Sequence, residues 1–358
     1  MGQEIQLKLN NNNVSPTVEK VGDGNLQGFT ATDLTGAANE LKNTLTQLDS
    51  DLDSEIATRQ TYVRPNLLDN WYFVYGKTIN NDYSSNGTFP VNQRGQRSYS
   101  SSGYTFDRWY SDVNVSINNT GDTVTITNNN NSGAWFRQVL GNVPKETIVG
   151  AAFVTAYSGT CILTMQEKGG GYQTVFSKTL SEVGVVSASG QATASNQYNF
   201  GFYLSAGASV TFKAMKLEIG SGQTLAHQEN GVWVLNEIPN YWEELAKCQR
   251  YFLNLSSYER NGGSLQACIG QVYCFDTGAA MIQIPTPVTM AKAPTTIALN
   301  GSVVIIASTT KYKQVSNATP TAITKNSNHI YLTINCDLVK GDTGYFQSTD
   351  GFTISADL

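Results

Sequence analysis

The segment 113–126, VNVSINNTGDTVTI, indicates the fold class of this chain. Valine and isoleucine occupy every second position on both sides of the turn-forming sequence 119–122. That period belongs to strands with one buried face, and two such runs around a Gly-containing turn predict an antiparallel hairpin. We therefore expect the chain to fold mainly as β-sheet.

Similar runs continue toward the C-terminus. They predict strands at 135–140, 148–155, 162–166, 172–176, 198–204 and 210–219. In the last run the apolar phase moves from Phe212 and Ala214 to Met215 and Leu217, which predicts a β-bulge. Short strands separated by Gly- and Asn-rich turns predict a β-sandwich over about 66–230.

A second β-unit is expected after a short helix at 241–246, which follows Pro239. A strand is predicted at 249–253, and 269–275 with 279–284 should form a hairpin around the turn 276–278. Apolar residues at every second position of 330–336, followed by Phe352 and Ile354, complete this unit.

A helix is predicted upstream, from Leu34 to Arg59. Leucines and one alanine recur there in two series seven residues apart, an a/d heptad pattern. Ile56 comes four residues after Leu52, which we interpret as a stutter, and Arg64–Pro65 should end the helical segment. A stripe this narrow most simply pairs with other copies of the chain, through Leu34, Leu41, Leu45, Leu48, Leu52 and Ile56. The alternative is an amphipathic helix that packs on the chain's own β-domain.

These patterns divide the chain into four parts. They are an N-terminal segment at 1–30, a coiled-coil helix at 31–64, a jelly-roll sandwich at 65–235 and a C-terminal sandwich at 240–358. The predicted fold class is thus mainly β, with a short coiled coil between the N-terminal segment and two β-sandwich domains; the resemblance described below implies that the coil is trimeric and that the N-terminal segment is an attachment segment. A heptad seam of leucines does not itself choose between two, three and four strands.

Composition excludes several functions. Only 14% of the 358 residues are charged, and the net charge of -5 provides no basic footprint for nucleic acid. No apolar run approaches the length of a membrane span, and no signal peptide begins the chain. The 5 cysteines contain no CxxC pair, which favours buried free thiols and synthesis in a reducing cytoplasm.

Three passages resemble a module of phage and prophage tail fibre proteins. They are PNLLDNWYF at 65–73, PVNQRG at 90–95 and FDRW at 106–109. WFRQVL at 135–140 and KLEIG at 216–220 resemble parts of a jelly-roll similar to carbohydrate-binding modules. ELAKCQRYF at 244–252 and IPTPVTMAKAPT at 284–295 are similar to the beginning of a C-terminal tail-fibre head domain.

This resemblance implies a homotrimer that is part of the virion. The N-terminus would attach to tail or baseplate proteins, and the C-terminal domain would adsorb to a bacterial surface polysaccharide. The protein would be made in the host cytoplasm, without membrane insertion, nucleic acid or a cofactor.

Catalytic and metal motifs are weak. Asp49, Asp51 and Asp53 begin like a calcium loop, but Ser54 replaces the glycine and Gln60 the closing glutamate. The 2 histidines lack metal-ligand spacing, and no G-x-S-x-G elbow occurs. A glycosidase site needs two carboxylates at a set distance in space, and the fold rather than the spacing in the sequence determines that distance. We expect no enzyme, catalytic residue, metal or cofactor.

Binding has better support, because sugar sites combine aromatic faces with amide and carboxylate groups. The predicted glycan site lies in the C-terminal unit, at Tyr258, Tyr312, Tyr345, Phe346 and Asp342. Middle-unit aromatics also lie near turns: Tyr104, Trp109, Tyr110, Trp135 and Tyr172. For this group the alternative is core or hairpin packing, and for Trp109 and Trp135 core packing is the favoured interpretation.

Four hypotheses stay open. The first is a trimeric tail fibre or receptor-binding protein, and the second a purely structural baseplate or neck component. The third is a glycan depolymerase, and the fourth the fibre of a contractile bacteriocin.

Overall fold

The chain divides into two compact units between Tyr62 and Val63 in the computed structural model. The structure describes residues 34–59, 63–74, 89–94, 102–120, 122–141, 143–168, 173–193, 197–255, 267–299, 303–308, 311–315, 322–326, 329–335, 339–348 and 352–356. The predicted attachment segment 1–30 lies outside these residues.

Helix α1 (Leu34–Arg59) is the described part of the first unit. Its bounds agree with those that the heptads predict. Three leucines of the predicted stripe are exposed, Leu41 by 53%, Leu45 by 65% and Leu48 by 66%. An exposed row of leucines leaves apolar surface in water, which is costly unless another surface covers it. Trimeric coiling of α1 remains a prediction.

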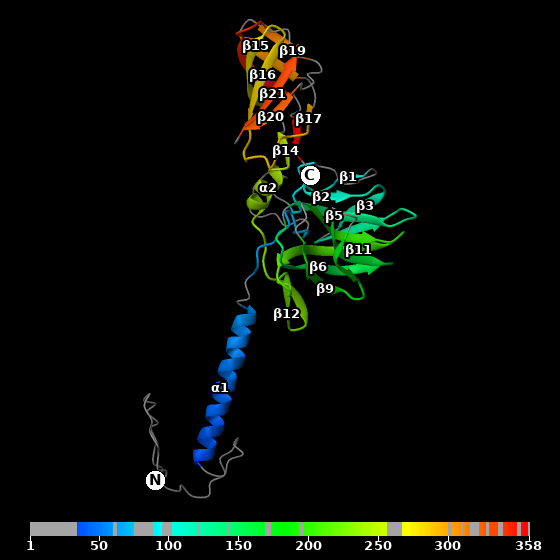
Figure 1. The fold of residues 1–358 in the computed structure, drawn as a ribbon, viewed down its shortest axis with the longest axis vertical. Coiled ribbons are helices and arrows are strands. Elements are labelled where there is room, and N and C mark those ends of the chain that lie inside the picture. The colour runs from blue at the N-terminus through cyan, green and yellow to red at the C-terminus, as the bar shows by residue number, and fades with distance from the viewer. Residues whose placement is uncertain are drawn as a thin grey trace. The chain divides into compact units, whose positions relative to one another are not determined.

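The second unit begins with two antiparallel sheets that pack as a sandwich (Figure 1). The six-stranded sheet has the order β1 (Gly103–Tyr104), β2 (Trp109–Ser111), β5 (Ala134–Gly141), β10 (Gln197–Leu204), β7 (Cys161–Glu167), β8 (Thr174–Thr179). The five-stranded sheet has the order β3 (Val115–Thr120), β4 (Thr123–Asn128), β11 (Ser209–Ile219), β6 (Thr147–Ser158), β9 (Gly184–Gln191). Antiparallel sheets and a mainly β fold are therefore confirmed.

The hairpin β3–β4 confirms the pattern at 113–126. Ile117 lies opposite Ile126, and both are buried together with Val115 and Val124. Val113 is an exception, because it precedes the strand and is 48% exposed.

Strand β11 contains the predicted bulge. Its register against β6 shifts on both sides of Phe212, slightly earlier than the phase change in the sequence indicates. Beyond the bulge, the polar Lys216 and Glu218 are buried as fully as Met215 and Leu217. Alternation alone did not reveal that both faces of this central strand are covered.

Several elements were missed by the sequence patterns. Strand β9 combines Val185 and Val186 with Ser, Ala and Gly, a weak strand signal that pairing with β6 overrides. The two short strands β1 and β2 have too few residues to show a period.

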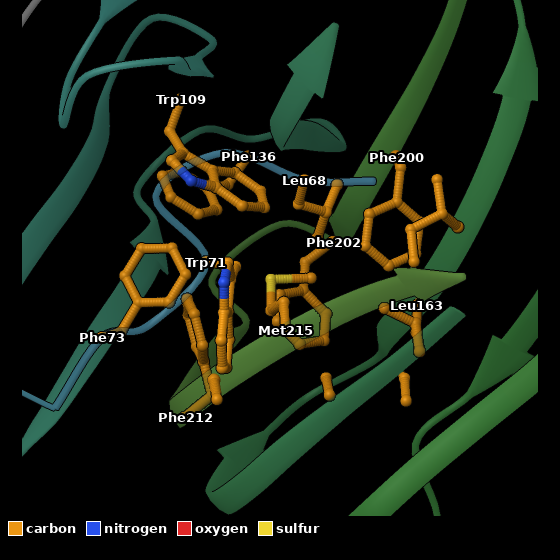
Figure 2. Packing of buried hydrophobic residues seen from close by; sticks show 14 of the residues in the cluster. Leu68, Trp71, Phe73, Trp109, Phe136, Leu163, Phe200, Phe202, Phe212 and Met215 are labelled. Carbon is orange, nitrogen blue, oxygen red and sulfur yellow. The ribbon is translucent and has the colours of Figure 1, made fainter. Parts of the chain in front are cut away.

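Aromatic rings fill the space between the two sheets. Trp109 stacks on Phe136 with ring centroids 5.0 Å apart, and Phe73 meets Phe212 edge to face at 4.8 Å (Figure 2). Phe73 belongs to the segment that follows Pro65 and that bonds to β11, with its N–H donating to Lys213 O at 2.7 Å. The residues after the helix thus form part of the core.

Helix α2 (Tyr241–Gln249) follows the hairpin of β12 (Ala226–Glu229) and β13 (Val232–Leu235). Asn240 caps it by accepting a hydrogen bond from the N–H of Trp242. The expectation of a strand from 249 is wrong at its start, because α2 continues through Gln249. Glu244 and Cys248 are buried on one face of the helix, which explains why it continues.

The C-terminal strands form two further antiparallel sheets. The three-stranded sheet has the order β14 (Phe252–Leu255), β23 (Phe352–Ser355), β17 (Thr296–Leu299). The seven-stranded sheet has the order β19 (Lys311–Val315), β18 (Val303–Ser308), β22 (Thr343–Ser348), β15 (Ala267–Asp276), β16 (Ala279–Pro285), β21 (His329–Asn335), β20 (Ala322–Asn326). The predicted hairpin around 276–278 is confirmed as β15–β16.

Two arginines join the sandwich to the chain after α2. The guanidinium carbon of Arg108 lies 3.5 Å from the ring centroid of Tyr251, and that of Arg94 lies 3.7 Å from the ring of Phe252. Nearby, the N–H of Asn70 donates to Glu244 Oε2 at 2.7 Å. These contacts connect residues separated by more than a hundred positions in the sequence.

Cys161, Cys248 and Cys274 are buried thiols, as expected of small core cysteines. In the described part of the chain, no helix has both the length and the apolar character needed to span a membrane.

Candidate functional site

A cleft of about 510 Å³ lies on the face of the six-stranded sheet that points away from the core. It is lined by Tyr104, Tyr110, Asp112, Trp135, Arg137, Val139, Gln166, Lys168 and Asn199. The residues between them along the strands, such as Phe136 and Phe200, point into the sandwich and are buried. The same alternation that builds the core therefore places polar and aromatic side chains together on the outer face.

Strand pairing arranges these residues in rows across the sheet. Tyr104 lies opposite Tyr110, which lies opposite Arg137 and then Gly201. Since Gly201 has no side chain, the middle of the row is left open. The backbone needs glycine there, because φ is 158° and the Cβ of any other residue would lie 2.1 Å from Phe136 O.

The rows on either side of Gly201 have different chemistry. Trp135 lies opposite Tyr203 on one side, and Asn199 lies between Val139 and Gln166 on the other. One side is therefore aromatic, and the other carries amides.

The aromatic side chains hold one another in fixed orientations. Tyr104 and Tyr110 meet edge to face at 5.4 Å, and Trp135 meets Tyr203 at 5.5 Å. Between these pairs, the guanidinium carbon of Arg137 is 5.1 Å from the ring centroid of Tyr110 and 5.7 Å from that of Trp135. Such contacts limit rotamer changes, so the cleft is largely preformed.

Asp112 connects the backbone and the side chains of the cleft. Its Oδ2 accepts from the N–H of Trp135 at 2.9 Å, and its Oδ1 accepts from Nη1 of Arg137 at 3.1 Å. Both carboxylate oxygens are thus occupied, and one positive charge is balanced. Lys168 makes no ion pair with any residue that the structure describes.

Asn199 is the polar residue most deeply placed in the cleft. It is 6% exposed, and its Oδ1 has no hydrogen-bond partner among the described residues. A buried amide oxygen without a partner costs free energy, which a ligand hydroxyl or a bound water would recover.

The lining of the cleft contains one carboxylate, that of Asp112. Its single carboxylate is engaged by Trp135 and Arg137, whereas a glycosidase needs two carboxyl groups on opposite sides of a bond. Among the described residues, no group of three or more His, Cys, Asp or Glu side chains is placed to hold a metal ion. Aromatic faces with amide groups suit a ligand that has both apolar faces and hydroxyls.

The sequence-predicted glycan residues are placed differently. Tyr345 is 54% exposed on β22, and strand register relates it to Tyr312 through Ile306. Phe346 belongs to the neighbouring row, opposite Gly270, while Tyr258 lies outside the described residues. Asp342 accepts from the N–H of Val339 at 3.0 Å, a turn-forming contact.

The middle-unit aromatics divide between core and cleft. Trp109 is fully buried, which agrees with the favoured core interpretation. For Trp135 that interpretation is wrong, because this residue lines the cleft together with Tyr104 and Tyr110. Tyr172 lies outside the described residues. Sequence reasoning missed Asn199 and Gln166, since an Asn or Gln inside a strand carries no signal of its own.

Comparisons with known proteins give only distant likenesses. No protein-family model matches the chain, and no curated protein matches it. One similar solved structure is described as "CBM4 structure and function", with 8% identity, a TM-score of 0.23, and 30% of this chain and 75% of that chain covered. Another is the tandem CBM22-1–CBM22-2 domain of Xyn10C from Paenibacillus barcinonensis, with 10% identity, a TM-score of 0.24, and coverages of 74% and 98%. Both TM-scores lie below 0.5.

Proposed function

We propose that the outer cleft of the six-stranded sheet binds a glycan. The observation that carries this proposal is a preformed hollow that combines the aromatic rings of Trp135 and Tyr110 with the buried, unpartnered Asn199 Oδ1. A sugar ring has an apolar face that stacks on aromatic rings and an edge of hydroxyls that bond to amides. The cleft offers both groups.

We further propose that the whole chain is a trimeric tail fibre or receptor-binding protein of a phage. The sequence passages at 65–73, 106–109 and 244–252 support this role, as do the exposed leucines of α1. In this proposal, the N-terminal segment attaches to the tail or baseplate, and the glycan belongs to a bacterial surface. The protein acts in the virion without catalysing a reaction.

Three linked copies would strengthen a weak glycan site. When one site is occupied, the tether holds the other two at a high effective concentration near the same surface. Moderate affinity at each cleft is then enough for stable adsorption.

Binding of the full-length protein to purified envelope polysaccharides of candidate hosts tests the proposal. We expect Trp135→Ala to weaken binding about tenfold or more, because about 1.4 kcal/mol of lost stacking corresponds to that factor. Trp242→Ala is the matched control, since Trp242 is 53% exposed on α2 and does not line the cleft.

Two results would contradict the proposal. One is equal binding by the wild type and Trp135→Ala, which would place recognition elsewhere. The other is shortening of the polysaccharide during incubation, which would show a depolymerase instead.

A further inference from the structure

The charges that line the outer cleft do not cancel. Three of its residues are charged, Asp112, Arg137 and Lys168. Asp112 and Arg137 neutralise each other, because Oδ1 of the aspartate accepts from Nη1 of the arginine at 3.1 Å. Lys168 makes no ion pair with a residue that the structure describes, so one positive charge is left over. The whole chain has a net charge of -5, so this positive charge is a local property of the cleft.

Lys168 lies at one end of the cleft, directly after β7. Its N–H donates to Gln197 O at 2.9 Å, which continues the pairing of β7 with β10 past the end of the strand. Strand alternation therefore places its side chain on the same outer face as Gln166, which also lines the cleft. The side chain is exposed, and its flexible four-carbon stem allows the ammonium group to reach over the cleft.

The carboxylate next to Lys168 in the sequence does not balance its charge. Glu167 lies opposite Tyr198, which is fully buried, so the glutamate side chain leaves the sheet on the side of the core. Its Oε2 accepts from the hydroxyl of Thr193 at 2.5 Å. The ammonium group of Lys168 is therefore available to an anionic group of a ligand.

Strand register orders the chemistry of the cleft along β10. Tyr203, Gly201, Asn199 and Gln197 belong to successive rows, which are aromatic, open, amide-bearing and beside Lys168. Successive rows are about 7 Å apart, since a strand rises about 3.4 Å per residue. A sugar ring that donates a hydroxyl to the unpartnered Asn199 Oδ1 would thus present a substituent on its far edge to Lys168.

We propose that the glycan of this cleft is acidic and that Lys168 binds its anionic group. The inference rests on the proposed function, because it names the class of glycan for the same cleft. A uronic acid carboxylate and a phosphate diester both suit lysine, which acts as a compact point charge rather than as a planar fork. Lys168 then selects acidic over neutral glycans, while Trp135 and Asn199 hold the sugar ring.

The expected contribution of Lys168 is moderate. A hydrogen bond between charged groups is stronger than one between neutral groups, but water and salt screen an exposed pair. Loss of the pair should therefore weaken binding about five- to tenfold. The same screening predicts that affinity for the acidic glycan falls as the salt concentration rises.

One polysaccharide in several chemical forms tests the inference. Oligosaccharides short enough for one cleft are prepared from the envelope polysaccharide that the wild type binds, and are used native, carboxyl-reduced and dephosphorylated. Each form is titrated into the full-length protein by calorimetry. We expect one of the two treatments to weaken wild-type binding about five- to tenfold, and that treatment identifies the anionic group as carboxylate or phosphate.

Lys168→Met is the deciding variant. It should bind the native form about five- to tenfold more weakly than the wild type does, and it should bind the native and neutral forms equally. Its affinity should also depend less on salt. Lys178→Met is the matched control, because Lys178 is exposed on β8 of the same sheet and does not line the cleft. Its affinity should stay within about twofold of the wild type.

The outcomes separate this inference from the proposed function. Equal wild-type binding of the native and neutral forms overturns the inference, and the glycan cleft stands if Trp135→Ala still weakens both. An equal loss for both forms in Lys168→Met also overturns it, since the lysine would then contact a neutral group. Equal binding by Lys168→Met and Lys178→Met would show that Lys168 is only a solvated surface residue. A wild type that binds no envelope polysaccharide overturns the proposed function and the inference together.

Discussion

Arg108 lies with its guanidinium carbon 3.5 Å from the ring centroid of Tyr251, and its Nε donates to Asp69 Oδ2 at 2.9 Å. The arginine is 3% exposed and has φ of 75°, so the backbone of the loop before β2 is turned to bring this side chain inward. One guanidinium thus joins the segment after the first helix, the sandwich and the chain after α2. This contact is one of several that join the two β-regions within the second unit.

Arg108→Ala should therefore destabilise the second unit. It removes the cation–π contact and leaves the carboxylate of Asp69, 23% exposed, without its partner. We expect a loss of about 3 kcal/mol in the free energy of unfolding, measured by denaturant titration. Lys213→Ala removes a partly exposed ion pair with Asp122 and should cost less than about 1 kcal/mol. Equal losses in the two variants would contradict this reading.

Trp109→Ala should test the core. Trp109 stacks on Phe136 and donates from Nε1 to Asn70 O at 2.9 Å, so the change leaves a cavity and an unbonded carbonyl. A loss of about 3 to 5 kcal/mol is expected in the same titration. The exposed Trp242→Ala provides the comparison, with a change below about 1 kcal/mol. A small effect at Trp109 would mean that the sandwich core collapses around the missing ring.

Two substitutions of Tyr110 distinguish the contribution of ring stacking from that of the hydroxyl hydrogen bond in the cleft. Tyr110→Phe keeps the ring beside Tyr104 and Arg137 and should leave glycan affinity within about threefold. Tyr110→Ala removes the ring, and we expect the dissociation constant, measured by titration calorimetry, to increase about tenfold. If Tyr110→Phe already abolished binding, the hydroxyl rather than the ring face would be the contact.

The leucine stripe of α1 has a direct test. Leu41→Asp/Leu45→Asp/Leu48→Asp should weaken self-association in sedimentation, because charges cannot be buried in a helix seam. The control carries the same added charge outside the a/d positions, at Asn43, Thr46 and Ser50. If the leucine variant sediments as the wild type does, the β-domains hold the assembly and the helix is secondary.

Cysteine reactivity follows from burial. Desolvation raises the pKa of Cys161 to about 11 and raises the pKa of Cys248 well above its usual range. Since the thiolate is the reactive form, both should resist alkylation by iodoacetamide at pH 8 and react quickly after unfolding. A raised folded-state pKa also means that stability is fully present below the usual thiol pKa and falls as pH rises toward 11 at Cys161. Rapid native-state labelling of Cys161, read from peptide masses, would contradict its burial.

Local sequence patterns predicted the elements in which apolar residues recur at a regular spacing. The hairpin β3–β4, the bulge of β11 and helix α1 could be predicted because alternation, phase shifts and heptads are properties of neighbours in the sequence. Strand β9 could not, because Ser, Ala and Gly carry little strand preference until β6 supplies the pairing.

The candidate site divides in the same way. The sequence showed that aromatic residues such as Trp135 lie near turns. It did not show which of them are exposed, because Trp109 and Trp135 have similar sequence surroundings. The C-terminal prediction named Tyr312 and Tyr345, whose register relation appears only through the pairing of three strands.

What the sequence by itself determined is the mainly β fold, the helix at Leu34–Arg59 and the character of its stripe, because each depends on short-range periodicity. Only the tertiary structure decided that Tyr110, Arg137 and Asn199 share one hollow and that Arg108 reaches Tyr251. Those relationships join residues from strands far apart in the chain, and sheet order and register, rather than local preference, set the distances between them.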